Sequence, residues 1–216
     1  RTLLQRVPHL DLVLGPDAID RVGELINDVV ERGERLVEAK FDVEGRSYSQ
    51  PCVVQKAKPS EFLTIMKGCD HFCTYCIVPF VRGREKSRSI EEIITDVKNL
   101  VAKGTKEVTF LGQNINTYGK GTGQKLSQLI EAANEVSGLE RIRYVTSHPR
   151  DLGEDLIAQF GTVEKLCPAL HLPFQAGSNR ILKAMSRLYT QELYLSKIEL
   201  LRKARPDIAL STDVIV

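Results

Sequence analysis

Short apolar runs alternate with longer stretches in which apolar residues recur every three or four positions. The apolar runs predict strands at 62–66, 107–111, 142–146, 169–174 and 208–216. The longer stretches predict helices after Ser89 and at about 125–137, 154–160, 178–186 and 190–204. Strict alternation of strands and helices is typical of a parallel sheet with helical crossovers. Because the strands are apolar on both faces, we expect an α/β fold, a partial parallel (β/α) barrel with the helices outside.

The clearest helix signal begins at Ser89. Ser89 and Glu92 have the spacing of a capping box, and Gly104 is placed to end the helix. Its apolar positions form one stripe, which we expect to be buried: Ile93, Ile94, Val97, Leu100 and Val101.

A smaller pattern precedes the barrel. Residues 10–14 predict a strand, and Pro16 starts a helix that Gly33 closes. The apolar face of this helix comprises Ile19, Val22, Leu25, Ile26 and Val29. Residues 34–59 are polar and irregular, with breakers at Pro51 and Pro59, so they predict a linker or a hairpin.

Composition narrows the classes of protein. The 216 residues are 42% hydrophobic and carry a formal net charge of +2, so any basic surface for nucleic acid must be local. No apolar run of about 18 residues and no signal peptide occur, so we expect a cytoplasmic protein without a membrane span. The chain starts at Arg1 and stops in an apolar, β-branched run, from which we expect a piece of a longer protein.

Three of the five cysteines, Cys69, Cys73 and Cys76, lie within eight positions, whereas Cys52 and Cys167 stand alone as expected bystanders. A cluster of this kind more often binds metal than forms disulfides. Structural zinc needs four ligands, and only His71 or the two isolated cysteines could supply a fourth. Three thiolates on a four-iron, four-sulfur cluster leave one iron open to the amine and carboxylate of S-adenosylmethionine (SAM).

The stretch "GCDHFCTYCIVPFVRGREKSR" resembles the radical SAM methylthiotransferases. Residues 110–119, 144–152 and 170–190 are similar to the members of that family that modify N6-isopentenyladenosine in tRNA. The resemblance implies that the three cysteines bind a 4Fe–4S cluster, that SAM is cleaved to a 5′-deoxyadenosyl radical, and that a methylthio group is added at adenine C2. Methylthiotransferases of a ribosomal-protein aspartate or of threonylcarbamoyladenosine in tRNA stay open, as does a non-catalytic iron–sulfur or zinc module.

The resemblance also implies cofactor contacts. Phe72 and Tyr75 would pack beside the cluster and the adenine, although Phe72 could equally serve ordinary loop packing. Gly112, Gln113 and Asn114 would hold the methionine amino group through amide oxygens, with a strand-end turn as the alternative. Further candidates at predicted strand ends are Ser147, His148, Gln175 and Ser178. His148 could instead be a turn residue, His171 a buried core imidazole, and Asp213 a residue that points inward.

A basic run follows the cysteines: Arg82, Arg84, Lys86 and Arg88. Such a run is usually a solvated face. Beside a cavity that admits a flipped-out nucleotide, it could contact the phosphates of a tRNA anticodon stem-loop.

The resemblance finally implies a domain division. Residues 1–59 would be the C-terminal remnant of an N-terminal α/β methylthiotransferase domain plus a linker, and 60–216 a radical SAM partial barrel cut before its last strand. A second 4Fe–4S cluster is expected only in the full-length protein, so the piece itself would be inactive. An electron donor such as flavodoxin or ferredoxin is implied as a partner, and the oligomeric state is left open.

Overall fold

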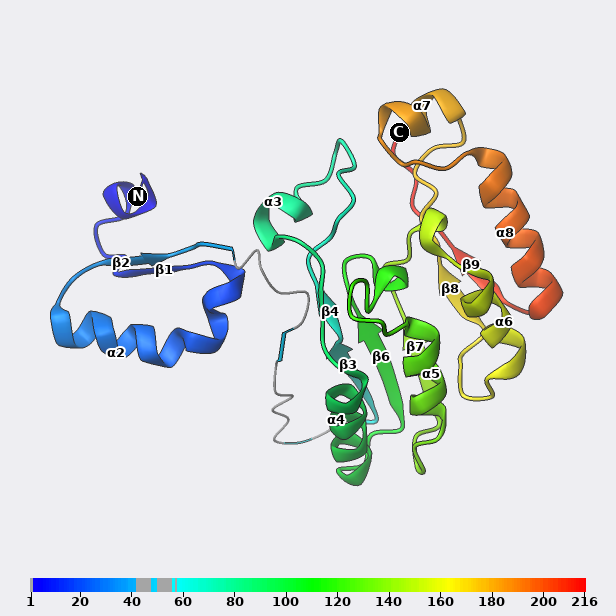
Figure 1. Ribbon diagram of the computed structural model, residues 1–216, viewed down its shortest axis with the longest axis horizontal. Coiled ribbons are helices and arrows are strands. Elements are labelled where there is room, and N and C mark those ends of the chain that lie inside the picture. Colours follow the sequence, from blue (N-terminus) through cyan, green and yellow to red (C-terminus); the bar gives the residue numbers. More distant parts are fainter. Residues whose placement is uncertain (1, 42–47, 50–55, 57) are drawn as a thin grey trace.

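The computed structural model describes residues 2–41, 48–49, 56 and 58–216 (Figure 1). Residues 2–41, here the N-terminal unit, contain α1 (Thr2–Arg6), β1 (Leu12–Leu14), the short helix η1 (Pro16–Arg21), α2 (Val22–Arg32) and β2 (Leu36–Glu38). β1 and β2 pair in parallel, with α2 as their crossover. The predicted linker at 34–59 therefore begins with a strand, while Pro51 and Cys52 lie outside the described residues.

Residues 58–216, here the larger unit, begin with a three-stranded parallel sheet. It consists of β3 (Ser60–Thr64), β6 (Glu107–Leu111) and β7 (Arg141–Tyr144), in the order β3-β6-β7. Helices α4 (Ile90–Ala102) and α5 (Leu126–Asn134) make the crossovers and pack against each other. The predicted strand at 107–111 is thus confirmed residue for residue.

A second parallel pair completes the described strands. α6 (Glu154–Thr162) leads to β8 (Ala169–His171), and α7 (Asn179–Ala184) and α8 (Gln191–Ala204) lead to β9 (Ala209–Ser211). A single bridge between Ile142 and Leu166 joins this side to β7, and the described strands do not close into a ring. The expected α/β fold with an open, partial parallel barrel is confirmed.

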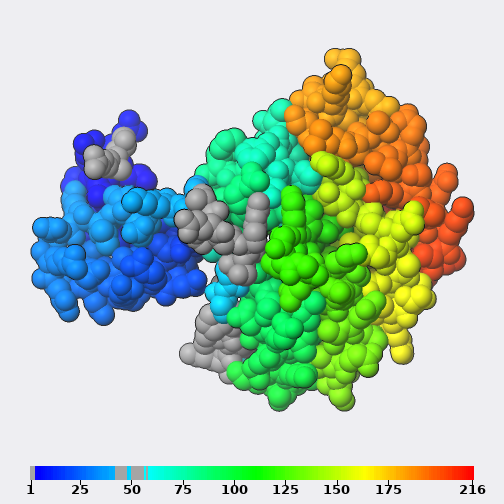
Figure 2. All heavy atoms as spheres, in the orientation of Figure 1, coloured from blue at the N-terminus to red at the C-terminus, as the bar shows by residue number. Residues whose placement is uncertain are grey.

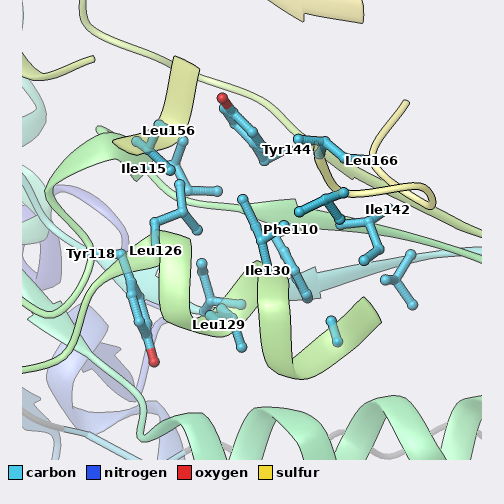
Figure 3. Close-up of a cluster of buried hydrophobic side chains, with 14 of the residues drawn as sticks. Phe110, Ile115, Tyr118, Leu126, Leu129, Ile130, Ile142, Tyr144, Leu156 and Leu166 are labelled. Atoms are coloured by element: carbon cyan, nitrogen blue, oxygen red, sulfur yellow. The ribbon is translucent and has the colours of Figure 1, made fainter. Parts of the chain in front are cut away.

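The core lies between the sheet and its helices. Phe110 of β6 and Ile142 of β7 are fully buried and lie beside Ile130 of α5 (Figure 3). These strand residues alternate with outward-facing polar positions in β7, where Arg141 and Arg143 are exposed. Every helix in the described ranges is too short or too polar to cross a bilayer.

Some predicted strands end earlier than expected: those at 169–174 and 208–216 end at His171 and Ser211, and a third departs further from the prediction. The strand expected at 62–66 ends at Thr64, and β4 (Met66–Lys67) turns away to pair antiparallel with β5 (Lys86–Ser87). The reason is local, because Gly68 has φ +77° and a Cβ there would lie 2.1 Å from the Arg84 carbonyl oxygen. The chain between β4 and β5 therefore forms a closed loop of residues 68–85, here called the cysteine loop, which contains α3 (Val78–Arg82).

The helical pattern after Pro16 is confirmed as η1 and α2, but its apolar face is only partly covered. Leu25 is buried, but Ile19, Val22 and Ile26 are exposed, because a two-stranded sheet offers little surface to cover them. Figure 2 shows this unit as a separate lobe beside the larger body. An ion pair of 2.8 Å between Asp17 and Lys67 connects the lobe to β4.

Candidate functional site

The base of the cysteine loop is fixed by backbone contacts. The Cys69 amide donates to the Gly83 carbonyl at 3.2 Å. Asp70 and Glu85 exchange hydrogen bonds, each amide donating to the other residue's carboxylate at 3.1 and 3.2 Å. These contacts close the loop at its base.

The three thiols lie on this loop without disulfide partners among the described residues. Cys69 and Cys73 are buried and Cys76 is half-buried. Burial raises the pKa of the Cys69 thiol to about 12, while the His71 amide, 3.4 Å from its sulfur, opposes the rise. Zinc would draw thiolates to within about 4 Å of one another, given Zn–S bonds of about 2.3 Å. The three sulfurs are not among the described groups whose ligand atoms lie within 4.8 Å of one another, so no zinc tetrahedron is preformed.

Three loops meet at Asp151, in the short helix η3 (Pro149–Asp151) after β7. Its Oδ2 atom lies 2.5 Å from His71 Nε2 of the cysteine loop and 2.8 Å from Asn114 Nδ2 after β6. The His71 ring stacks on His148, with centroids 4.4 Å apart. Burial alone would raise the pKa of Asp151, but the hydrogen bonds from His71 and Asn114 hold it below its ordinary value.

His148 is neutral in this setting. Burial, the charge of Arg187 and the neighbouring His71 lower its pKa to about 3. Its Nδ1 accepts from the Arg150 amide, and its own amide donates to Asn116 Oδ1. Sequence reasoning offered His148 as a cavity residue or a turn residue and missed Asp151. The position of Asp151 three residues after His148 was the available signal.

The strand-end residues after β6 and β7 lie side by side, since the Ile115 amide donates to the Thr146 carbonyl. Gly112 contacts Met66, and a Cβ at residue 112 would lie 2.5 Å from the Met66 Cγ atom. Three of the buried side-chain oxygens that have no hydrogen-bond partner in the described part of the chain belong to these strand-end residues: Gln113 Oε1, Asn114 Oδ1 and Ser147 Oγ. Unpaired buried oxygens are costly in a bare protein, and they are suited to a ligand that donates hydrogen bonds.

The other candidates lie apart from this junction. Gln175 has φ +66°, and its amide donates to the carbonyl oxygen of Asp213, which follows β9. Ser178 precedes α7 and is exposed. His171 is not a core imidazole, since it is half-buried and contacts Ser211 Oγ and Asp213 Oδ2 at 2.9 and 3.2 Å.

A cavity of about 540 Å³ opens beside the cysteine loop. Phe72 lines it and is about half exposed, as is Tyr75 on the same loop. The other walls include His71, Asp151, Lys120 and Arg150. The cavity therefore combines an aromatic ring, the Asp151 junction and two basic side chains.

The expected basic run does not form one surface. Arg82 and Arg84 are exposed, but Lys86 and Arg88 are buried and cannot contact RNA phosphates. Arg88 pairs with Asp96 at 2.5 Å and donates to the Thr64 carbonyl, so it fastens α4 to β3. β5 pairs with β4 inside the protein, and all of residues 85–88 are buried there. Lys120 and Arg150, which sequence reasoning missed, are exposed at the cavity.

Comparison with known proteins defines the class. The family model of the radical SAM superfamily matches residues 63–216, so the chain belongs to that superfamily. A radical SAM methyltransferase, TsrM from Kitasatospora setae, superposes with a TM-score of 0.62 over 94% of this chain and 44% of its own, at 13% identity. The cobalamin-dependent SAM radical enzyme OxsB superposes with a TM-score of 0.59 over 71% of this chain and 23% of its own, at 15% identity. These likenesses show the fold.

Proteins similar in sequence share one more specific name within the superfamily. The chain is 50% identical over 217 aligned residues to the tRNA-2-methylthio-N(6)-dimethylallyladenosine synthase of Trichlorobacter lovleyi, covering 99% of this chain and 49% of that protein. The same-named proteins of Geobacter sulfurreducens and Acetivibrio thermocellus are 50% and 45% identical, with 99% and 96% of this chain covered and 48% and 44% of theirs. The chain spans about half the length of the curated relatives it matches. Superfamily membership implies a 4Fe–4S cluster and SAM as cofactors.

Proposed function

We propose that this chain carries the catalytic core of a tRNA methylthiotransferase that acts at C2 of N6-isopentenyladenosine, also called dimethylallyladenosine. The observation that carries the proposal is the 50% identity, over nearly the whole chain, to relatives with that name. Those names favour this substrate over the ribosomal-protein aspartate and threonylcarbamoyladenosine. The three-cysteine loop in a radical SAM fold supports the reaction type.

In this proposal Cys69, Cys73 and Cys76 ligate the cluster. The donor set fits, because the thiols are free, lie on one loop and are not gathered around a point as a single zinc ion requires. The cysteine loop that bears these ligands is closed at its base by its own hydrogen bonds.

SAM is held by the loops beside the cysteine loop. Gln113 and Asn114 have buried oxygens that can accept from the cofactor's ammonium group, and Ser147 can accept or donate. Gly112 leaves room for Met66 and so allows the strand-end turn to approach β4. When bound together, the two cofactors supply a 5′-deoxyadenosyl radical for hydrogen abstraction. The residues around them bind, orient and exclude water from that chemistry.

The tRNA approaches the cavity beside Phe72. The exposed basic residues Lys120 and Arg150 line this cavity, and Arg82 and Arg84 are exposed on the cysteine loop. Phosphate contacts of this kind position an anticodon stem-loop whose unstacked adenosine enters the cavity, where Phe72 offers a ring for stacking. Tyr75 is a second exposed ring on the same loop. Arg84 and Lys120 already pair with Asp70, which sets their orientation.

Several features belong to the whole protein. We propose that residues 1–59 and 60–216 fall into separate domains, which the start of the family match at residue 63 supports. A second 4Fe–4S cluster, a flavodoxin- or ferredoxin-type electron donor and a cytoplasmic location complete the proposal.

Cysteine variants of the full-length protein test the cluster assignment. We expect Cys69→Ala, Cys73→Ala or Cys76→Ala, after anaerobic reconstitution, to bind about four fewer irons per chain than the parent. The electron paramagnetic resonance (EPR) signal that SAM perturbs should disappear with them. Cys167→Ala is the matched control, because Cys167 is also buried and free but lies outside the loop. Full iron content in the three variants would refute the assignment.

Mass spectrometry of tRNA tests the substrate. A deletion strain should lack the 2-methylthio group on isopentenyladenosine, and the parent gene should restore it while the Cys73→Ala gene should not. An unchanged level in the deletion strain would exclude this substrate.

A further inference from the structure

Arg187 is a buried arginine whose role the proposed reaction does not yet explain. It lies in the turn between α7 and α8, and only 5% of its surface is exposed. Its Nη1 atom is 3.5 Å from the Cys73 sulfur, and Nη2 donates to the Pro173 carbonyl at 3.1 Å. The guanidinium also lies over the Tyr189 ring, 5.4 Å from its centroid.

No carboxylate among the described residues forms an ion pair with Arg187. A guanidinium stays protonated in a protein. None of the ion pairs in the described part of the chain involves Arg187, and its Nε atom is buried without a hydrogen-bond partner there. A buried, unpaired charge is unfavourable, and an anion beside the guanidinium would stabilise it. A neutral Cys73 thiol does not supply that anion, whereas a thiolate does.

The backbone around Arg187 is built to hold this position. Ser186 and Leu188, on either side of it, have φ of +56° and +57°, a left-handed conformation that costs free energy in residues other than glycine. Met185, two residues before Arg187, accepts at its carbonyl oxygen from the Thr74 amide of the cysteine loop at 3.1 Å. The turn is therefore attached to the cysteine loop by the main chain as well as by the Arg187 side chain.

We propose that Arg187 is the buried countercharge of the Cys73 thiolate and of the iron–sulfur cluster bound there, and that it raises the reduction potential of that cluster. This inference rests on the proposed function. Reduction adds one electron from an external reductant and breaks no bond, so the bound state gains one negative charge beside the guanidinium. A fixed cation and an N–H donor to the sulfur both favour the reduced state. Arg187 is a positioning residue here, because it acts through Cys73.

Redox titration of the full-length protein tests the inference. The midpoint potential is measured without SAM by EPR under anaerobic conditions, with dithionite as the reductant. The signal followed is the one that later addition of SAM perturbs. We expect Arg187→Met to lower the midpoint potential, and Arg187→Lys, which keeps the charge but loses the planar donors, to lower it less. Arg180→Met on the exposed face of α7 is the matched control and should leave it unchanged.

Each outcome decides the matter. If Arg187→Met retains its cluster and its midpoint potential is unchanged, the inference is overturned. An unchanged potential together with a higher SAM concentration needed to perturb the signal would also overturn it and would assign Arg187 to SAM binding. If Arg187→Met does not fold or retain iron, Arg187→Gln, which removes the charge but keeps an amide donor, decides: a lowered potential supports the inference and an unchanged one overturns it. A parent protein that takes up no SAM-sensitive cluster refutes the proposed function, and this inference with it.

Discussion

Helices α2 and α4 carry similar apolar stripes, yet they bury them to different extents. In α4, Ile93 and Val97 are fully buried against the parallel sheet. In α2, Leu25 is buried and Ile26 is 48% exposed, and in η1 before it Ala18 is buried and Ile19 is 57% exposed. The apolar residues recur every three or four positions in both helices.

The difference lies in what each helix can cover. α4 crosses between β3 and β6, whose sheet is extended by β7 and covered again by α5. α2 crosses between β1 and β2, each three residues long. Two short strands offer too little apolar surface for a helix of eleven residues. Burial therefore depends on the size of the facing sheet, and the stabilities of the two units should differ accordingly.

The largest expected difference concerns ion pairs. Asp96 of α4 is the ion-pair partner of the buried Arg88. Asp96→Ala leaves this buried charge unpaired and should lower the free energy of unfolding by about 3–5 kcal/mol. Asp28→Ala removes the exposed partner of Arg32 in α2 and should cost about 0.3–0.5 kcal/mol. Urea unfolding followed by circular dichroism measures both. Equal effects would mean that the two pairs are equally solvated and would break the comparison.

The apolar stripes come next. Ile93→Ala should lower the free energy of unfolding by about 2–5 kcal/mol because it leaves a cavity between α4 and the sheet. Ile26→Ala, the same change on a half-exposed position of α2, should cost about 0.5 kcal/mol. A large loss for Ile26→Ala in the same urea experiment would show that its face is covered in solution.

A buried histidine sets the pH response of the larger unit, whereas His9 of the N-terminal unit is exposed. Unfolded His148 binds a proton near pH 6.5, but burial and the Arg187 charge lower its folded pKa to about 3. Between these values the unfolded state binds more protons, so stability falls as pH falls. We expect a loss of about 2 kcal/mol from about pH 8 to about pH 5. His148→Gln should flatten this slope, and an unchanged slope would assign the effect to other groups.

The smallest effects should be equal in the two helices. Gly33 and Gly104 follow the ends of α2 and α4 with φ of +63° and +103°, and both have open space where a Cβ would lie. Gly33→Ala and Gly104→Ala should therefore each cost about 1 kcal/mol from backbone strain alone. Thermal unfolding of the two variants measures this. A much smaller cost at Gly33 would indicate that the end of α2 frays before the unit unfolds.

The local signals in the sequence were sufficient for most elements. The capping box of Ser89 and Glu92 forms with both of its hydrogen bonds, and β6 has its predicted bounds. The cysteine spacing indicated a loop that binds a cluster, and the superfamily match agrees with that class. Each of these features depends on residues within about one turn or one strand of each other, where the side-chain period and capping chemistry decide the outcome.

The tertiary structure alone decided which distant residues serve the cysteine loop. Asp151 meets His71 across 80 positions of sequence, and Arg187 meets Cys73 across 114. It also turned Lys86 and Arg88 inward, although their sequence reads as a solvated run. No local pattern encodes these contacts, because they arise only when the loops after separate strands are brought to one edge of the sheet. The sequence by itself determined the elements and the thiol donors, and packing between elements determined their neighbours and charges.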